Sequence, residues 1–139
     1  MSNWDTYVRE SYDLIKHAET ELTVTLSEQV EAYLVHLFAH FMDKPLVNTV
    51  PVCVKLLTAT TLPTTIKKEV FKSVGDECLL INSMEWGSHR WPSKTYYAEM
   101  GQMAYMNRAY TNHPVEELYD ELATEFFTAT KILRKCKIN

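Results

Sequence analysis

Glycine is scarce in this chain, with three residues in a length of 139. Tight turns depend on glycine because it adopts positive φ angles at little steric cost. An all-β sandwich or a nucleotide-binding α/β unit needs many such turns. The shortage therefore argues against both classes and favours an all-α fold.

A long apolar run is also missing, because no segment reaches the roughly 18 apolar residues that a membrane span requires. The start of the chain, Met1 to Asp5, has no basic segment followed by an apolar stretch of the secretory type. Cys53, Cys78 and Cys136 are odd in number, widely spaced and embedded in apolar patterns, which is typical of reduced core cysteines. We therefore expect a cytoplasmic protein with no membrane partner.

Positive charge is in short supply as well: 14 Lys and Arg residues stand against 18 Asp and Glu residues, and the net charge is −4. Nucleic-acid binding depends on clustered Lys and Arg, so we expect no nucleic-acid partner. The sequence contains no Gly-x-Ser-x-Gly elbow, no phosphate-binding glycine loop and no Cys beside a His. Nucleophilic catalysis and nucleotide binding consequently have no support.

The five prolines divide the chain into blocks, because proline lacks an amide hydrogen and disfavours helical geometry in the preceding residue. No internal repeat, low-complexity tract or Gly/Ser linker separates these blocks, so residues 1–139 are predicted to form a single helical domain. Apolar residues at helical spacing predict a bundle of five to six helices. Their expected ranges are 5–18, 26–43, 51–60, 64–81, 93–110 and 114–137.

Local signals mark several helix ends. Thr25 followed by Glu28 is a capping-box pattern, and Ser93 is a good N-cap for the fifth segment. Segment 51–60 is rich in β-branched residues, so a strand is an alternative there. The last segment starts after His113 or Asn112 as its cap, with acidic residues first and basic residues last, in the order that suits the helix dipole.

Apolar stripes are expected to build the core. The stripe of the fourth segment consists of Ile66, Val70, Val74, Cys78 and Ile81. The stripe of the last segment consists of Val115, Leu118, Leu122, Phe126, Ala129 and Leu133. Gly75 within a helix is unfavourable by about 1 kcal/mol relative to Ala, which predicts a close contact or a break at this position. The small residues Ala98, Gly101 and Ala104 recur at spacing three and predict a close helix–helix approach, with Met103 and Met106 among the apolar residues beside them.

His36 and His40 lie one helical turn apart, the spacing at which two imidazoles can bind one metal ion. No Glu-x-x-His pair and no third ligand at fixed spacing accompany them. Both flank the apolar stripe of their helix, which is equally typical of ordinary boundary residues. The sequence thus implies no cofactor, and a divalent metal completed by Asp76, Glu77 or His89 is an alternative.

Aromatic and charged residues concentrate in the predicted connection between the fourth and fifth helices. Trp86, His89, Arg90 and Trp91 lie there, and such clusters are typical of recognition surfaces because Trp and Arg contribute much of the binding energy of interfaces. The alternative is that both indoles close the end of the bundle.

Tyr97 and Tyr105, on the Tyr/Met-rich helix, would suit a pocket for a flat small ligand, although such a stripe is more often core. Asp76 and Glu77 are candidate acid or base groups if buried, yet adjacent carboxylates on a helix usually point in different directions. Tyr33, on the same side of its helix as the two histidines, is expected to hydrogen-bond to them.

Two segments resemble a family of uncharacterised bacterial all-helical proteins. One runs from Val74-Gly75-Asp76 through Leu79-Leu80, and the other is Tyr96-Tyr97-Ala98-Glu99-Met100-Gly101-Gln102-Met103-Ala104-Tyr105. The family has a Gly-Asp pair and a Tyr-Tyr-x-x-Met-Gly-x-x-Ala-Tyr helix, and Tyr33-Leu34 is a weaker addition. The residues around Trp86 depart from the family's apolar connection. The resemblance implies a bacterial helical domain and carries no activity with it.

The function expected from these features is noncatalytic. We expect a binding or regulatory protein that acts through protein–protein association, by a helix face or the tryptophan connection, as a homodimer. The competing hypothesis is a metal- or small-ligand-binding enzyme that uses His36 and His40.

Overall fold

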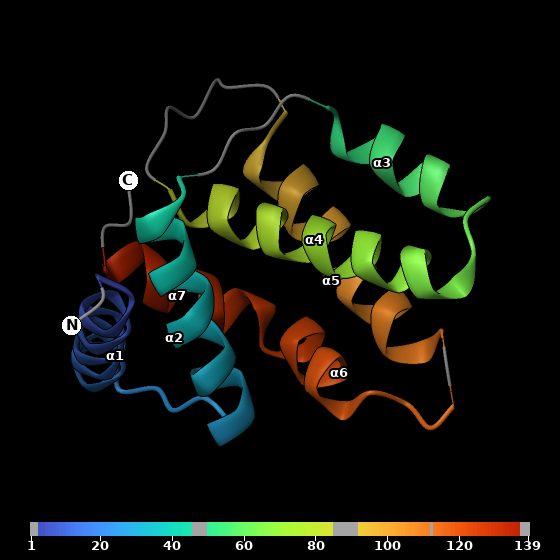
Figure 1. The fold of residues 1–139 in the computed structure, drawn as a ribbon. Helices are drawn as coiled ribbons and strands as arrows, with labels where there is room; N and C mark the ends of the chain where they lie inside the picture. The colour runs from blue at the N-terminus through green and yellow to red at the C-terminus, as the bar shows by residue number, and fades with distance from the viewer. Residues whose placement is uncertain (1–2, 46–49, 85–91, 112, 137–139) are drawn as a thin grey trace.

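The computed structural model describes residues 3–45, 50–84, 92–111 and 113–136, and within these ranges the fold is all-α (Figure 1). The all-α prediction is confirmed. The described residues form seven helices, so the predicted number of five to six is too low. They are α1 (Asn3–Leu22), α2 (Glu28–Asp43), α3 (Val52–Ala59), α4 (Thr64–Ser83), α5 (Lys94–Tyr110), α6 (Glu117–Thr124) and α7 (Phe126–Lys135). Within the described ranges, none of these helices has the length and apolar character needed to cross a membrane.

The additional helix arises because the predicted C-terminal helix is broken in two. Glu125, between α6 and α7, has φ −94° and ψ 14°, which is outside helical geometry. The carboxylates of Glu121 and Glu125 both bind Ser27 at the start of α2: Ser27 Oγ donates to Glu121 at 2.6 Å, and Ser27 N donates to Glu125 at 3.2 Å. This distant contact accompanies the break. Buried residues still follow one another at helical spacing across this break: Leu122, Phe126, Ala129 and Leu133.

The first helix of this pair also starts later than predicted. Glu117, and not Pro114, is the first residue of α6, and the His113–Pro114 peptide bond is cis. The backbone N–H of Glu116 donates to the carbonyl of Ala109 at 3.0 Å, which returns the chain toward the end of α5. His113 is therefore not the cap, because Glu116 occupies that position.

The start of α2 corrects a second prediction. Ser27 is the N-cap and accepts a hydrogen bond from the N–H of Val30 at 3.3 Å, whereas Thr25 lies outside the helix. Leu26, between them, is buried, and its N–H donates to the Glu19 carboxylate at 3.2 Å. The Leu26 side chain therefore enters the core before the helix begins, and Ser27 itself has an extended backbone. By contrast, the predicted Ser93 cap of α5 is confirmed by a hydrogen bond from Tyr96 N at 3.2 Å.

The helices are arranged around a packed pair formed by α4 and α5. Helix α3 packs on α4, and the predicted strand alternative for this segment is wrong. Helices α1 and α2 form a second pair on the other side of the molecule (Figure 1). Helix α6 contacts α5 and α2, and α7 contacts α4 and α1, so the two C-terminal helices join the pairs.

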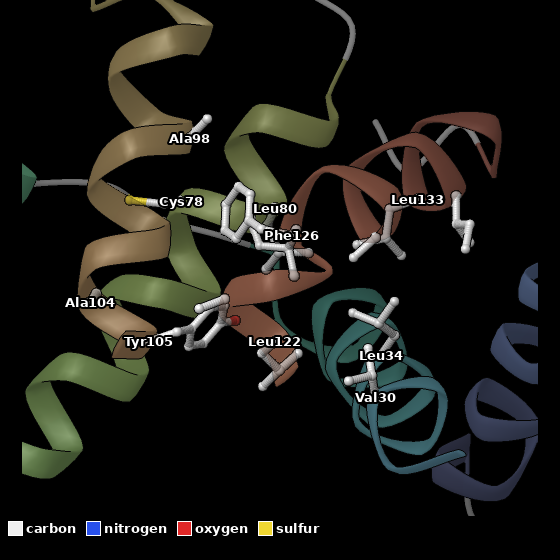
Figure 2. Packing of buried hydrophobic residues seen from close by; sticks show 14 of the residues in the cluster. Val30, Leu34, Cys78, Leu80, Ala98, Ala104, Tyr105, Leu122, Phe126 and Leu133 are labelled. Carbon is white, nitrogen blue, oxygen red and sulfur yellow. The ribbon is translucent and has the colours of Figure 1, made fainter. Parts of the chain in front are cut away.

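One cluster of buried residues draws on all seven helices. Figure 2 shows Tyr105 of α5, Phe126 of α7 and Leu34 of α2 directed into this interior. Ala98, Gly101 and Ala104 are all buried, as the small-residue row predicts. A Cβ on Gly101 would lie 2.6 Å from the Phe126 ring and 2.8 Å from Cβ of Cys78, so the predicted close approach is confirmed.

Some predicted core positions are exposed instead. The α4 stripe is fully buried only at Val74 and Cys78, whereas Ile66 is 51% exposed. Helix α3 packs beside α4 but buries only Val52 and Ala59, and it leaves Ile66 uncovered. Met103 and Met106 of α5 are also exposed, and Cys53 lies at the surface, contrary to its predicted core position.

A test of the end of α1 concerns Thr23, whose φ of 56° is in the left-handed region. The N–H of Val24 donates to the carbonyl of Glu19 at 3.1 Å, which is the helix-ending pattern that favours glycine at Thr23. We expect Thr23→Gly to raise the free energy of unfolding by about 1 kcal/mol, because a β-branched residue is strained there. Urea unfolding measures this change.

The matched control is Thr25→Gly, an exposed position without a positive φ. Glycine there only increases the freedom of the unfolded chain, so stability should fall by about 0.5–1 kcal/mol. A Thr23→Gly protein less stable than the parent would contradict the assignment of strain.

Candidate functional site

A buried carboxylate links three helices. The Oδ1 atom of Asp76 on α4 accepts hydrogen bonds from the hydroxyls of Tyr33 on α2, at 2.6 Å, and Tyr105 on α5, at 2.7 Å. Lys72 Nζ lies 3.3 Å from Oδ2. We call these four residues the Asp76 junction. Its carboxylate is 14% exposed and is surrounded by donors of the protein itself.

The electrostatics of the Asp76 junction keep both phenols protonated. Burial and the neighbouring Asp76 carboxylate raise the pKa of Tyr33 and of Tyr105 far above the ordinary value for tyrosine. Burial raises the pKa of Asp76, while Lys72 and the two tyrosine donors act in the opposite direction. The tyrosines therefore serve as permanent hydrogen-bond donors, and the junction has the chemistry of a structural link.

Gly75 makes room for this arrangement. A Cβ at Gly75 would lie 2.8 Å from Cζ of Tyr105 and closer still to two other ring atoms. The predicted close contact is confirmed, and α4 continues through Gly75 without a break. The Tyr33 ring packs edge-to-face against two other rings. The centroid distance is 6.5 Å to Tyr105 and 5.9 Å to Tyr119. These aromatic contacts orient both donors toward Asp76.

Glu77 turns toward a different helix. Its carboxylate is 5% exposed and lies 2.6 Å from Lys55 Nζ of α3. The two adjacent carboxylates thus point in different directions, as expected for neighbouring helical residues, but each is held by a lysine and turned away from free solvent. A role for Asp76 or Glu77 as acid or base stays a prediction.

The two histidines lie on the exposed surface of α2. His36 Nδ1 is 3.0 Å from the carbonyl oxygen of Ala32, and its ring is 6.3 Å from the Trp4 ring. Tyr33 binds Asp76, which corrects the expected hydrogen bond to the histidines, because the Tyr33 ring is directed between α4 and α5. Within the described ranges, no group of three or more His, Cys, Asp and Glu side chains is arranged to hold a metal ion. Metal binding by His36 and His40 stays a prediction.

Trp86, His89, Arg90 and Trp91, predicted to form a recognition surface, lie outside the described residues. Tyr97 is 7% exposed and Tyr105 is fully buried. Both tyrosines belong to the core cluster. Their expected role in ligand binding stays a prediction.

A surface feature that the sequence patterns did not indicate is a groove between α3 and α4. We call it the α3–α4 groove, and its volume is about 420 Å³. Its walls include Val54, Lys55, Thr58, Leu62, Ile66, Glu69 and Val70. Val54 is 46% exposed, and Leu57 on the same short helix is 70% exposed. Sequence reasoning placed Ile66 in the core because its helical spacing continues the buried stripe.

Comparisons of the chain with protein-family models, with curated proteins and with solved structures find no significant match. The resemblance to the bacterial helical family therefore stays a prediction. The function proposed below therefore rests on the geometry of the described residues alone.

The contact at Gly75 is tested by Gly75→Ala. The new methyl group must displace the Tyr105 ring and disturb its hydrogen bond to Asp76, so we expect a loss of about 1–3 kcal/mol in the free energy of unfolding. Chemical unfolding measures the loss. Ser73→Ala, at an exposed position of the same helix, is the control and should change stability by less than about 0.5 kcal/mol. Equal stability of Gly75→Ala and the parent would contradict the close contact.

The raised pKa of Asp76 predicts a pH-dependent difference between the parent protein and Asp76→Asn. A folded-state pKa above the unfolded value contributes stability that is complete below the unfolded pKa of about 3.9 and is lost as pH rises through the folded pKa. The asparagine does not titrate. Most other ionisable groups contribute equally to the unfolding free energies of the two proteins, so their contributions cancel in the difference. The stability of the parent relative to Asp76→Asn should therefore fall with rising pH in urea titrations from about pH 3 to about pH 8. A relative stability that rises with pH would contradict the direction of the shift.

Proposed function

We propose that this chain is a noncatalytic binding protein that works through self-association, with the α3–α4 groove at the centre of a homodimer interface. The carrying observation is the exposure of two large aliphatic side chains that line the groove, Val54 and Ile66, and of Leu57 on the same helix as Val54. Leu57 is 70% exposed, Ile66 is 51% exposed and Val54 is 46% exposed. Contiguous apolar surface of this kind on a small domain is characteristic of association sites.

The side of α3 that faces away from the core leaves this surface available for a partner. Val52 and Ala59 attach α3 to the core, while the intervening turns leave Val54 and Leu57 on the outside. The Lys55–Glu77 ion pair, at 2.6 Å, holds α3 against α4. A fixed helix with an outward apolar side loses little conformational freedom on binding, which favours association.

A second copy of the chain suits the charges of the groove. Lys55 and Glu69 both line it, and Glu69 is 70% exposed. Within one copy Lys55 pairs with Glu77 at 2.6 Å and Glu69 lies 3.4 Å from Arg108. In a two-fold symmetric contact each copy presents the same surface to the other, so the exposed Glu69 carboxylate of one copy can also approach the Lys55 ammonium of the other. The apolar centre and charged margin match the usual anatomy of a protein interface.

The homodimer is tested by sedimentation velocity over a range of protein concentrations. We expect a concentration-dependent dimer for the parent protein. The double variant Leu57→Lys, Ile66→Lys should raise the dimer dissociation constant by more than about tenfold, because it places charge in a desolvated contact. Circular dichroism checks that both proteins retain their helix content.

Met106→Lys is the matched control, since Met106 is 44% exposed and lies on α5, away from the α3–α4 groove. This variant should dimerise like the parent. A parent protein that remains monomeric up to about 1 mM would overturn the homodimer, as would a dimer that the double variant leaves intact.

A further inference from the structure

The connection between α1 and α2 is held by a buried carboxyl group. Glu19, near the end of α1, is 7% exposed. Its Oε2 atom accepts a hydrogen bond from the N–H of Leu26 at 3.2 Å, and its main-chain carbonyl accepts one from the N–H of Val24 at 3.1 Å. One residue of α1 therefore fixes two positions of the segment that leads into α2.

The second oxygen of this carboxyl group has no donor. Glu19 Oε1 is enclosed and lacks a hydrogen-bond partner among the described residues. A buried polar atom left in this state costs about 1–3 kcal/mol. Because protein surrounds the atom, a ligand from solvent does not reach it. Its partner has to come from within the fold.

The group that interacts with Glu19 from α2 is a second carboxyl group. Glu31, in the first turn of α2, acts directly on the Glu19 side chain. Its own Oε2 atom lies 3.0 Å from Lys16 Nζ, and its side chain is 14% exposed. Two ionised carboxylates have only acceptors and repel each other, whereas a single proton turns such a pair into a hydrogen bond. We call these two residues the Glu19–Glu31 pair.

The surroundings of the Glu19–Glu31 pair decide which member holds a proton. Burial and the contact with Glu31 raise the pKa of Glu19, although the Leu26 amide and the Lys16 ammonium act in the opposite direction. Burial also raises the pKa of Glu31, but hydrogen bonds with Glu19 and Lys16 outweigh it, so this pKa lies below its usual range. The proton therefore belongs mainly to Glu19, and the negative charge belongs to Glu31 beside Lys16.

Other charged groups on the neighbouring elements have partners outside the pair. Helices α2 and α7 both pack on α1, and Lys135 of α7 lies 3.6 Å from Glu21. The carboxylates of Glu121 and Glu125 accept hydrogen bonds from Ser27. Lys16 is thus the cation that acts on both members of the pair.

We propose that Glu19 and Glu31 share one proton and form a pH-sensitive latch between the end of α1 and the first turn of α2. In the closed latch, Oε1 of protonated Glu19 donates to Glu31, while Oε2 accepts from Leu26. When the proton passes to solvent, the two carboxylates repel, and Glu31 turns outward with the half-exposed Lys16. The start of α2 is then held less firmly against α1. The latch shares no residue with the α3–α4 groove and does not depend on the proposed homodimer.

The shared proton is tested by measuring the pKa of Glu19 in the full chain from the ¹³C chemical shift of its carboxyl carbon. In the parent protein we expect a value above the ordinary one of about 4.3. Glu31→Gln replaces the neighbouring charge by an amide that can donate to ionised Glu19. The pKa of Glu19 should therefore fall by about one pH unit or more in this variant, a tenfold change in proton affinity. A pKa that Glu31→Gln leaves unchanged would show that burial alone holds the proton, and it would overturn the latch.

Glu28→Gln is the matched control, because it removes the same charge from an exposed position in the same turn of α2. Solvent screens this charge, so the pKa of Glu19 should change by less than about 0.3. Equal effects of Glu28→Gln and Glu31→Gln would indicate a general charge effect and would also contradict a shared proton.

The opening of the latch is tested with Glu19→Gln, which stays neutral and keeps both a donor for Glu31 and an acceptor for Leu26. A raised folded-state pKa gives stability that is complete below the unfolded pKa and is lost as pH rises through the folded pKa. The parent should therefore lose stability relative to Glu19→Gln in urea unfolding between about pH 4 and about pH 9.

Hydrogen exchange locates this loss. The amide of Glu31 donates to the carbonyl of Ser27 at 2.9 Å in the first turn of α2. At equal pH, its protection should be lower in the parent than in Glu19→Gln above the pKa of Glu19, and the same in both proteins below it. A ratio of the two protections that does not change with pH would overturn the latch.

Discussion

The close packing of α4 against α5 is the contact on which the other helices depend. Two glycines allow this close packing, because the Tyr105 ring occupies the space beside Gly75 and the Phe126 ring occupies the space beside Gly101. Phe126 belongs to α7, so the same close approach that joins α4 and α5 also creates the site where α7 docks (Figure 2). The hydroxyl of Tyr105 then meets Asp76, and the hydroxyl of Tyr33 brings α2 to the same carboxylate. The absence of a side chain at Gly75 thus makes room for the Tyr105 ring, whose hydroxyl then reaches Asp76.

The C-terminal helices attach the α1–α2 pair to this centre through polar contacts at helix ends. Glu121 and Glu125 bind Ser27, where a carboxylate interacts favourably with the positive end of α2. At the end of α5, both carboxylate oxygens of Glu116 accept from Arg108, whose guanidinium lies 4.5 Å from the centroid of the Tyr119 ring. Acidic side chains of the α6–α7 segment and its cap thus reach partners at the start of α2 and on α5.

Two buried polar groups of α4 differ in their hydrogen bonding. Asp76, in the middle of α4, receives hydrogen bonds from two tyrosines and a lysine, all from the protein itself. Asn82, near the C-terminal end of α4, has an enclosed oxygen without a partner, beside a similarly unpaired Arg134 Nε. The two sites thus differ in whether the described residues supply hydrogen-bond partners for a buried polar group.

Sequence alone determined the features that depend on neighbours within about four residues: the all-α class, the Ser93 cap, and the small-residue row of α5. The α3 helix and the close contact at Gly75 were predicted in the same way. Tertiary structure decided the remainder. The hydrogen bonds from Ser27 to Glu121 and Glu125, which accompany the break at Glu125, join residues 94 and 98 positions apart. Tyr33 binds Asp76, 43 positions away, because α2 is brought against α4. Ile66 continues the helical stripe of α4 yet is exposed, because periodicity specifies a face of a helix but not what covers that face.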